Sequence, residues 1–211
     1  MENDYPFVIT IVGAESSGKT VLAKQLAEAL SCVWVPEYAR EYLEKLDRSY
    51  EFEDLEEIAK GQLNLMPFKV IGLPPSPLKS LPASPLNSPL PQSPEYVLPP
   101  IPLKGVLNHS FELSDFILEL KSLGRQIVIV DSGLLTIRMW ARIKYGRTIP
   151  FVEEAMKQDL TCLYLLCRPR MEWESDPQRE APWLVDRVWI YNQYLKELVR
   201  ENYNYKIVAT G

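Results

Sequence analysis

The sequence predicts an α/β domain in which a mostly parallel β-sheet is covered by helices on both faces, as a three-layer sandwich. Three observations carry this prediction. Short, almost wholly apolar runs alternate with amphipathic helical patterns, as expected where parallel strands are buried on both faces. A glycine-bearing loop joins the first apolar run directly to the first helical pattern. The 211 residues, 46% of them hydrophobic, suffice for one domain with its own core.

The first apolar run covers residues 7–12, and the first amphipathic helix ends at Leu30. The loop between them, residues 13–20, matches the pattern G-x-x-x-x-G-K-[ST] and has the flanking strand and helix of a phosphate-binding P-loop. Lys19 is expected to reach the β- and γ-phosphates, and the Thr20 hydroxyl to bind Mg²⁺. A nucleoside triphosphate site is therefore predicted. The residues assigned to it are Gly13, Ala14, Glu15, Ser16, Ser17, Gly18, Lys19 and Thr20.

A second strand of the parallel sheet is predicted at 32–36, where a short apolar run ends in a proline, and charged residues follow it at the start of a helix. Ligands of open α/β sheets bind at the carboxyl ends of strands, so Glu37, Tyr38 and Arg40 are candidates for an acceptor site. The alternative is a solvated, ion-paired first helical turn. A further helix is predicted over 52–65, where Gln62 shares one face with four apolar residues, Leu55, Ile58, Ala59 and Leu63.

A proline-rich stretch then interrupts the pattern, with 12 of the chain's 18 prolines between Pro67 and Pro102. Such a segment favours polyproline II or disorder over packed structure. Neither flank holds enough strands for a core of its own, so we expect one domain over 1–211, interrupted by a low-complexity insertion at about 67–110. A docking segment for a protein partner is the alternative interpretation of the insertion.

Regular patterns resume with a helix at 113–123 and an apolar strand at 126–131 that ends in Asp131. An acid at the end of such a strand is typical of the Walker B element, whose carboxylate lies at the Mg²⁺ of P-loop proteins. The alternative role for Asp131 is a helix N-cap. A helix follows from 134, and its Trp140 is compatible with either the core or a pocket wall.

The last part of the chain is predicted to form a strand at 161–167, a helix beginning at about 184 and a strand at 205–209. Between the first two lies a loop dense in charge, which includes Arg179. Arginines after a strand are typical of a kinase lid that neutralises the transferring phosphoryl group. A merely solvated loop is the alternative.

Composition argues against several classes of protein. The net charge of −5, with acids and bases interspersed, is unlike that of a nucleic-acid-binding protein. No apolar stretch is long enough to span a bilayer, and the acidic N-terminus lacks the basic region of a signal peptide, so a cytoplasmic protein with no membrane contact is expected. The three cysteines are expected to be buried thiols, and the single histidine, His109, argues against histidine catalysis.

Several segments together resemble the ribosylnicotinamide kinase domain of NadR-type proteins and their stand-alone relatives, the AAA-type P-loop ATPases and kinases. The segments are the loop at 13–20, the run 36–42, Asp131 with Leu134 and Leu135, and the charged region 173–180. The resemblance covers residues 5–66 and about 112–211. It implies a P-loop NTPase fold of the nucleoside- or nucleotide-kinase type. Bifunctional relatives carry an adenylyltransferase domain ahead of the kinase, and only six residues precede the first strand, so that activity is expected to be absent.

This resemblance implies transfer of a phosphoryl group from ATP to the 5′-hydroxyl of nicotinamide riboside, with Mg²⁺, in NAD synthesis. Carried over to this chain, the catalytic residues would be Lys19, Glu37, Asp131 and Arg179, and the metal ligands Thr20 and Asp131. The acceptor would contact Glu37, Tyr38, Arg40 and Trp140.

The end of the Walker B strand departs from the family pattern. The family tends to have Asp-Thr-Asp there, whereas this chain has Asp131-Ser132-Gly133, so a second carboxylate is missing. Its role would then fall to Glu37, or catalysis would be impaired. Two other functions stay open at this point: a kinase for another nucleoside or nucleotide, and a regulatory ATPase or nucleotide switch that phosphorylates no metabolite.

Overall fold

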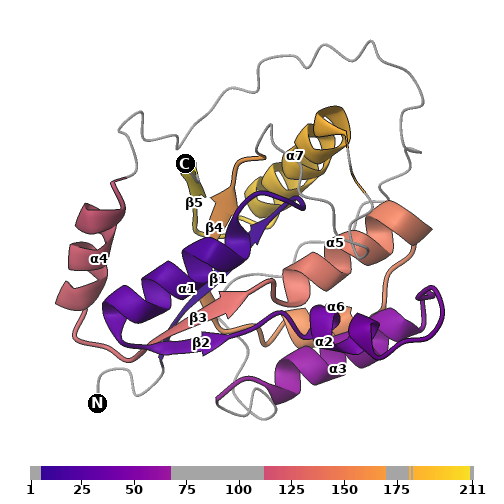
Figure 1. Cartoon of the computed structure of the whole chain (residues 1–211), viewed down its shortest axis with the longest axis horizontal. Coiled ribbons are helices and arrows are strands. Elements are labelled where there is room, and N and C mark those ends of the chain that lie inside the picture. Colours follow the sequence, from indigo (N-terminus) through magenta and orange to yellow (C-terminus); the bar gives the residue numbers. More distant parts are fainter. Residues whose placement is uncertain (1–5, 68–111, 170–180, 182, 210–211) are drawn as a thin grey trace.

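The computed structural model describes residues 6–67, 112–169, 181 and 183–209. Within these ranges the chain forms one five-stranded sheet in the order β2-β3-β1-β4-β5, and every pairing is parallel (Figure 1). The strands are β1 (Phe7–Gly13), β2 (Val33–Val35), β3 (Ile127–Asp131), β4 (Thr161–Cys167) and β5 (Tyr205–Val208). The predicted α/β fold with a parallel sheet is confirmed.

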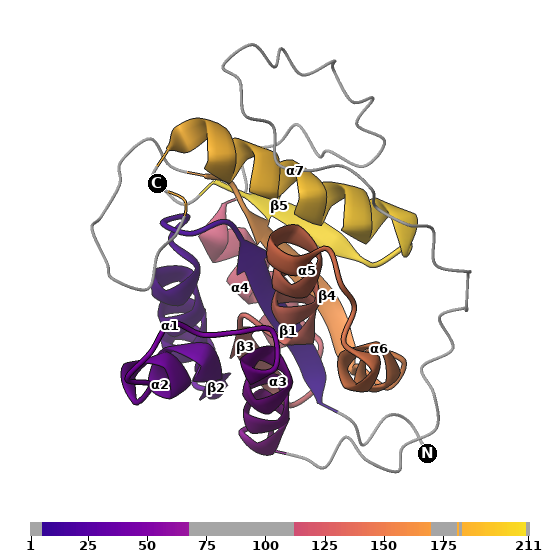
Figure 2. The same ribbon diagram turned by 90° about the vertical axis from the view of Figure 1, so that its right-hand side faces the viewer.

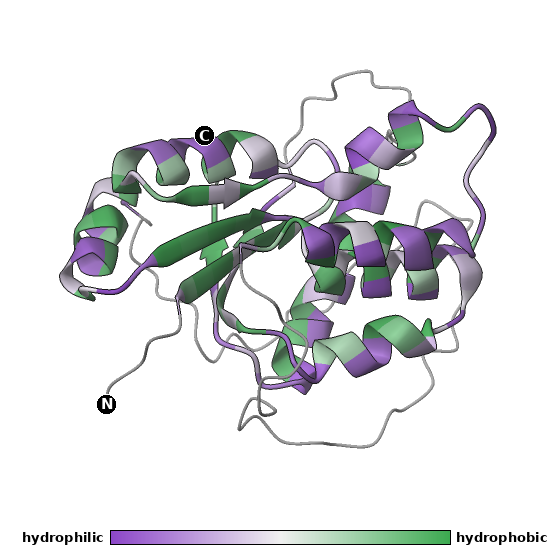
Figure 3. Cartoon of the chain, turned by 90° about the horizontal axis from the view of Figure 1, so that it is seen from below, coloured by the Kyte–Doolittle hydropathy of each residue, from purple (hydrophilic) through white to green (hydrophobic). Residues whose placement is uncertain are grey.

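Helices cover both faces of the sheet. One face packs against α1 (Lys19–Leu30) and α4 (Leu113–Ser122) through the side chains of Ile9, Ile11 and Ile129. The other packs against α3 (Asp54–Asn64), α5 (Leu134–Tyr145), α6 (Pro150–Met156) and α7 (Leu184–Arg200). In Figure 2, α3, α5 and α6 lie in front of the sheet and α4 behind it. Figure 3 shows the strands as the most hydrophobic layer, which follows from their burial between the helices.

The strand order brings three loops together at one edge of the sheet. Strand β3 lies between β1 and β2, and its register pairs Ile11 with Asp131 and Val35 with Val130. Asp131 therefore ends β3 beside the point where β1 enters the P-loop. The turn after β2 leads into α2 (Tyr38–Glu44), a helix with no buried residue.

Most predicted elements are present within one or two residues of their expected bounds, with two differences. Helix α6 was not predicted. Of the three cysteines, all in the described part of the chain, none forms a disulfide; Cys167 is buried as expected, but Cys32 and Cys162 are only half-buried.

The insertion, apart from Pro67, and His109 lie outside the described residues. None of the helices in the described part of the chain combines the length and the apolar character needed to cross a bilayer.

A buried ionic cluster holds α5, α6 and α7 together. Glu197 of α7 is 2% exposed, and its Oε1 lies 3.1 Å from an Nη of Arg138, 2.8 Å from Arg142 and 2.7 Å from Arg200. Arg138 and Arg142 also pair with Glu153 of α6. The buried charges of Arg138 and Arg142 on α5 are therefore balanced by carboxylates from two other helices, α6 and α7.

Replacing Glu197 by alanine is expected to destabilise the fold strongly. The substitution removes one of the two carboxylates, Glu197 and Glu153, that two largely buried guanidinium groups share, and breaking a buried ion pair of this kind costs about 3 kcal/mol. Urea denaturation followed by circular dichroism measures the loss. Lys157→Ala, which removes an exposed ion pair with Glu154 on α6, is the matched control and should leave the unfolding midpoint unchanged. Equal midpoints for the two variants would show that the cluster is not a stabilising element.

Candidate functional site

The loop between β1 and α1 has the backbone of a phosphate cradle. Gly13 has a φ of 146°, and a Cβ there would lie 2.8 Å from the carbonyl oxygen of Cys167, so no larger residue fits. Gly18 has a φ of 80° and ends the loop as the N-cap of α1. The helix N-terminus and the preceding N–H groups are thus available to an anion. The Lys19 Nζ folds back over the loop and donates a hydrogen bond of 2.8 Å to the Ala14 carbonyl.

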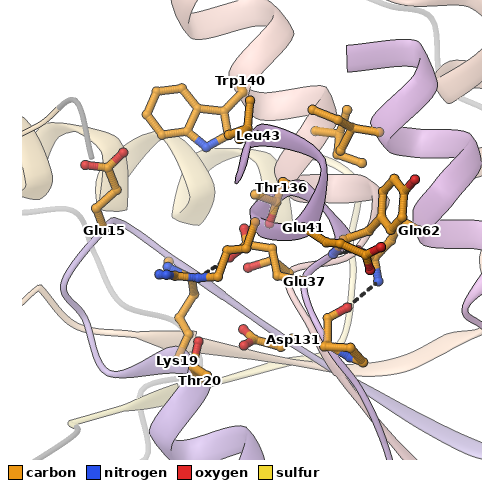
Figure 4. A pocket seen from close by; sticks show the side chains of 18 of the residues that line it. Glu15, Lys19, Thr20, Glu37, Glu41, Leu43, Gln62, Asp131, Thr136 and Trp140 are labelled. Atoms are coloured by element: carbon orange, nitrogen blue, oxygen red, sulfur yellow. Dashed lines mark hydrogen bonds and ion pairs between the residues drawn. The ribbon is translucent and has the colours of Figure 1, made fainter. Parts of the chain in front are cut away.

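A cavity of about 670 Å³ opens beside this loop, at the carboxyl ends of β1, β2 and β3. It is walled by the P-loop, the turn after β2, and helices α2, α3 and α5. Figure 4 shows Lys19, Glu37 and Asp131 gathered in one part of it, with Glu15 and Trp140 farther along. A cavity of this size at the strand ends is typical of a ligand site in an open α/β sheet.

Nearly all predicted site residues line this cavity. They are Gly13, Glu15, Ser16, Ser17, Gly18, Lys19, Thr20, Glu37, Tyr38, Arg40, Asp131 and Trp140. Ala14 is buried behind the loop and does not line it. Arg179 lies outside the described residues. Trp140, for which core and pocket wall were both open, is a pocket wall that also packs against the core.

Asp131 has the surroundings of a metal ligand. It is 1% exposed, and its Oδ1 has no hydrogen-bond partner among the described residues. The N-cap of α5 is Gly133, without a side-chain cap, so the alternative of Asp131 as an N-cap is wrong. This buried oxygen lies in a cavity that Thr20 also lines. A carboxylate and a hydroxyl oxygen placed in this way fit a hard divalent cation such as Mg²⁺.

Glu37 is a carboxyl group in a mixed electrostatic environment. Its side chain is 21% exposed, and its Oε2 lies 3.5 Å from Arg40 Nε. Burial raises the pKa of Glu37 above its ordinary value, and the Asp131 carboxylate raises it further, whereas the charges of Lys19 and Arg40 lower it. The net effect is a carboxylate with increased proton affinity inside the cavity.

The structure shows where a side chain at position 133, the place of the missing second acid, would begin. A Cβ at this position would lie 3.1 Å from Thr10 Cγ2 and 3.7 Å from Val130 Cγ1. Those atoms border a separate cavity of about 20 Å³, which Gly133 lines, and Gly133 does not line the large cavity. A side chain at 133 would therefore start away from the large cavity. Ser132, with a φ of 56°, makes the turn there, and its N–H donates to the Ile11 carbonyl at 3.1 Å.

Other residues of the cavity were not predicted from the sequence. Glu41, Glu44 and Tyr50 line the side next to α2, and Gln62 lines it from α3. Gln62 is the one for which the sequence held a signal, because it is a polar residue on an otherwise apolar helical face. Its amide bonds to the turn that carries Glu37.

The P-loop also reaches the segment before α7. A carboxylate oxygen of Glu15 accepts a hydrogen bond of 3.0 Å from the backbone N–H of Ala181, which is buried. Glu15 therefore ties the phosphate loop to the start of the last helical region, 166 residues later in the chain.

Comparison with known proteins agrees with this geometry. The family that matches is described as an AAA domain, and the match covers residues 8–66 and 112–211. No curated protein matches the chain.

Three solved structures share the fold. NadR in complex with NR superimposes with a TM-score of 0.59 at 18% identity, over 96% of this chain and 45% of NadR. NadR in complex with NAD and AMP-PNP gives 0.52 at 18% identity, over 98% and 44%. Thymidylate kinase from Ehrlichia chaffeensis gives 0.52 at 12% identity, over 98% and 88%. The chain thus spans less than half the length of the NadR chains. It is a P-loop nucleotide-binding domain with a kinase-like fold, and it belongs to the family of AAA domains.

Proposed function

We propose that this chain is an ATP- and Mg²⁺-dependent small-molecule kinase, and that nicotinamide riboside is its acceptor. The observation that carries the proposal is the convergence of Lys19, Asp131 and Glu37 on one cavity that extends well beyond the phosphate loop. A nucleotide-binding switch needs the first part of that cavity only. The remaining space, between α2, α3 and α5, is where an acceptor would bind.

The charge and the aromatic residues of the acceptor side favour a nucleoside over a nucleotide. Among the residues that the structure describes, Glu37, Glu41 and Glu44 line it together with one arginine, Arg40. An acceptor phosphate would meet more carboxylates than guanidinium groups. A pyridinium ring, as in nicotinamide riboside, would gain from these carboxylates and from aromatic faces such as Tyr38. One of the similar NadR structures was solved with NR.

The proposed reaction is an in-line phosphoryl transfer. The acceptor hydroxyl oxygen bonds to the γ-phosphorus of ATP as the bond to the bridging oxygen breaks, and ADP leaves with that electron pair. Glu37 takes the proton of the hydroxyl, for which its raised pKa suits it. Lys19 and the N–H groups of the loop neutralise the phosphate oxygens. Thr20 and Asp131 would hold Mg²⁺, whose charge would further neutralise the phosphate oxygens.

The test of this function is acceptor-dependent ADP release. The full chain is incubated with MgATP and a panel of nucleosides and nucleotides that includes nicotinamide riboside, and phosphorylated products are identified by mass spectrometry. The kinase proposal expects ADP and a monophosphate product in equal amounts with nicotinamide riboside. A different phosphorylated acceptor would correct the substrate. Slow ADP release that no acceptor accelerates would contradict the proposal and favour a regulatory ATPase.

The metal site makes a separate prediction. Asp131→Asn keeps the size of the side chain but removes its charge, so the Mg²⁺ concentration needed for half-maximal activity should rise by roughly 100-fold. Binding is checked without turnover by the difference in ATP-induced thermal stabilisation with Mg²⁺ and with EDTA, which should nearly vanish. Asp115→Asn, an exposed carboxylate on α4, is the control. An unchanged Mg²⁺ requirement in Asp131→Asn would remove this residue from the metal site.

A further inference from the structure

Helix α2 carries the acceptor side of the cavity, and it meets the core only through half-buried side chains, those of Tyr38, Ala39, Tyr42 and Leu43. Glu37 is its N-cap, Tyr38 is its first residue, and none of its residues is buried. Helices of the sheet layers are fixed by the apolar face they bury. Polar contacts with its neighbour α3 add to this limited packing: the Tyr42 hydroxyl donates a hydrogen bond of 2.8 Å to Asp54, and a second set of bonds comes from Gln62.

The side chain of Gln62 on α3 bonds to both sides of Glu37. Its Oε1 accepts a hydrogen bond of 2.8 Å from the Tyr38 backbone N–H, and its Nε2 donates one of 3.1 Å to the Pro36 carbonyl, drawn as a dashed line in Figure 4. Gln62 is 2% exposed, so water does not compete for either bond. One amide therefore clamps the two peptide groups that flank the proposed base.

The Tyr38 N–H depends on this bond. The first N–H groups of an α-helix have no partner within the helix, and α2 has no side-chain cap from Glu37. Without Gln62, the Tyr38 N–H and the Pro36 carbonyl would each need a new partner, and the turn could rotate to find one.

Gly61, the neighbour of Gln62, sets how closely α2 approaches. A Cβ at Gly61 would lie 1.9 Å from Tyr38 Cε1, so the Tyr38 ring lies directly against the backbone of α3. Glycine in a helix interior is destabilising relative to alanine, and here this close approach explains its presence. Gly61 and Gln62 thus place the ring of Tyr38 and the carboxylate of Glu37 from one turn of α3.

We propose that Gly61 and Gln62 are positioning residues for the acceptor side, and that they act through Tyr38 and Glu37 without touching the nucleotide. The inference rests on the proposed kinase function. A reacting group displaced by about 1 Å loses roughly 100-fold in rate. The P-loop makes none of these contacts, so nucleotide binding should not depend on the pair.

Gln62→Met tests the clamp, because methionine keeps the length and packing but makes neither hydrogen bond. We expect kcat/KM for the acceptor to fall roughly 10- to 100-fold, with the KM for ATP unchanged. Gly61→Ala leaves the clamp in place and displaces Tyr38 instead, so it should raise the acceptor KM while leaving α3 at least as stable. Leu63→Ala, one residue further along α3 and outside the large cavity, is the matched control for lost packing.

Hydrogen exchange gives a readout that needs no activity. In Gln62→Met the Tyr38 amide should exchange at least about tenfold faster than in the unaltered chain, whereas Leu63→Ala should not single out this amide. If the acceptor kinetics and the Tyr38 exchange of Gln62→Met match those of Leu63→Ala, the positioning role is wrong. If exchange responds as expected but the unaltered chain phosphorylates no acceptor, the clamp stands and the kinase function fails.

Discussion

Lys19→Ala is expected to reduce phosphoryl transfer by about 1000-fold or more while the protein stays folded. Within the described part of the chain, the Lys19 side chain makes one hydrogen bond, to the Ala14 carbonyl, and it is only partly buried, so its loss leaves no buried charge behind. In the reaction its ammonium group would lie between the β- and γ-phosphates, where negative charge moves during transfer. Preorganised charge of this kind supplies most of the catalysis in phosphoryl transfer.

The measurement is steady-state ADP formation with saturating acceptor, next to a thermal melt of the same preparation. The melting temperature should stay within a degree or so of the unaltered chain, since the substitution is on the surface of the loop. Lys121→Ala, an exposed lysine on α4, controls for lost charge and should be fully active. Full activity in Lys19→Ala would contradict the use of this loop as the phosphate site.

The sequence predicted the parts of the fold whose information is local. The P-loop with its flanking strand and helix, and the apolar strand that ends in Asp131, are continuous segments with their own pattern. Their meeting point could also be predicted in outline, since the carboxyl ends of parallel strands share one edge. The position of β3 between β1 and β2, which pairs Ile11 with Asp131, required the structure.

The acceptor side was less predictable because it depends on contacts between separate segments. The hydrogen bond between Gln62 and Tyr38 joins residues 24 positions apart. The contact of the Tyr38 ring with Gly61 depends on the close approach of α2 and α3, which the sequence pattern of neither helix indicates. Burial of charged residues such as Glu197 likewise follows from partners on other helices. Short α6, seven residues long, offers too little periodicity to be found.

Glu37 shows the same division between sequence and structure. Its place after the second strand is local, and was predicted. Its increased proton affinity comes from burial and from the nearby carboxylate of Asp131, which lies 94 residues later in the chain. A role as base could therefore be suggested from the sequence, but the physical reason for it could not.

Glu37→Gln is expected to separate activity from stability. Loss of the proposed base should lower acceptor-dependent turnover by roughly 100- to 10,000-fold. In the unaltered chain kcat/KM should rise with pH as Glu37 loses its proton, and this rise should be absent in the variant. ATP binding should be retained, because the P-loop is unchanged.

Although Glu37→Gln should lower activity, it is expected to raise the stability of the fold. Because burial raises the pKa of Glu37 in the folded state, the folded chain binds more protons than the unfolded chain between the ordinary and the raised pKa. The contribution of Glu37 to stability is therefore largest below its ordinary pKa and is lost as the pH rises through the folded value. Glutamine has no such loss, so the melting temperature of Glu37→Gln should exceed that of the unaltered chain by an amount that grows as the pH rises from the ordinary pKa of a glutamate through the raised pKa of Glu37. Melts across this range in the absence of nucleotide and Mg²⁺ measure this difference in melting temperature.

The control is Glu44→Gln, which alters an exposed carboxylate at the end of the same helix and should show no such trend. A variant that is both inactive and less stable at every pH would mean that Glu37 is held by favourable contacts and is a structural residue of the turn.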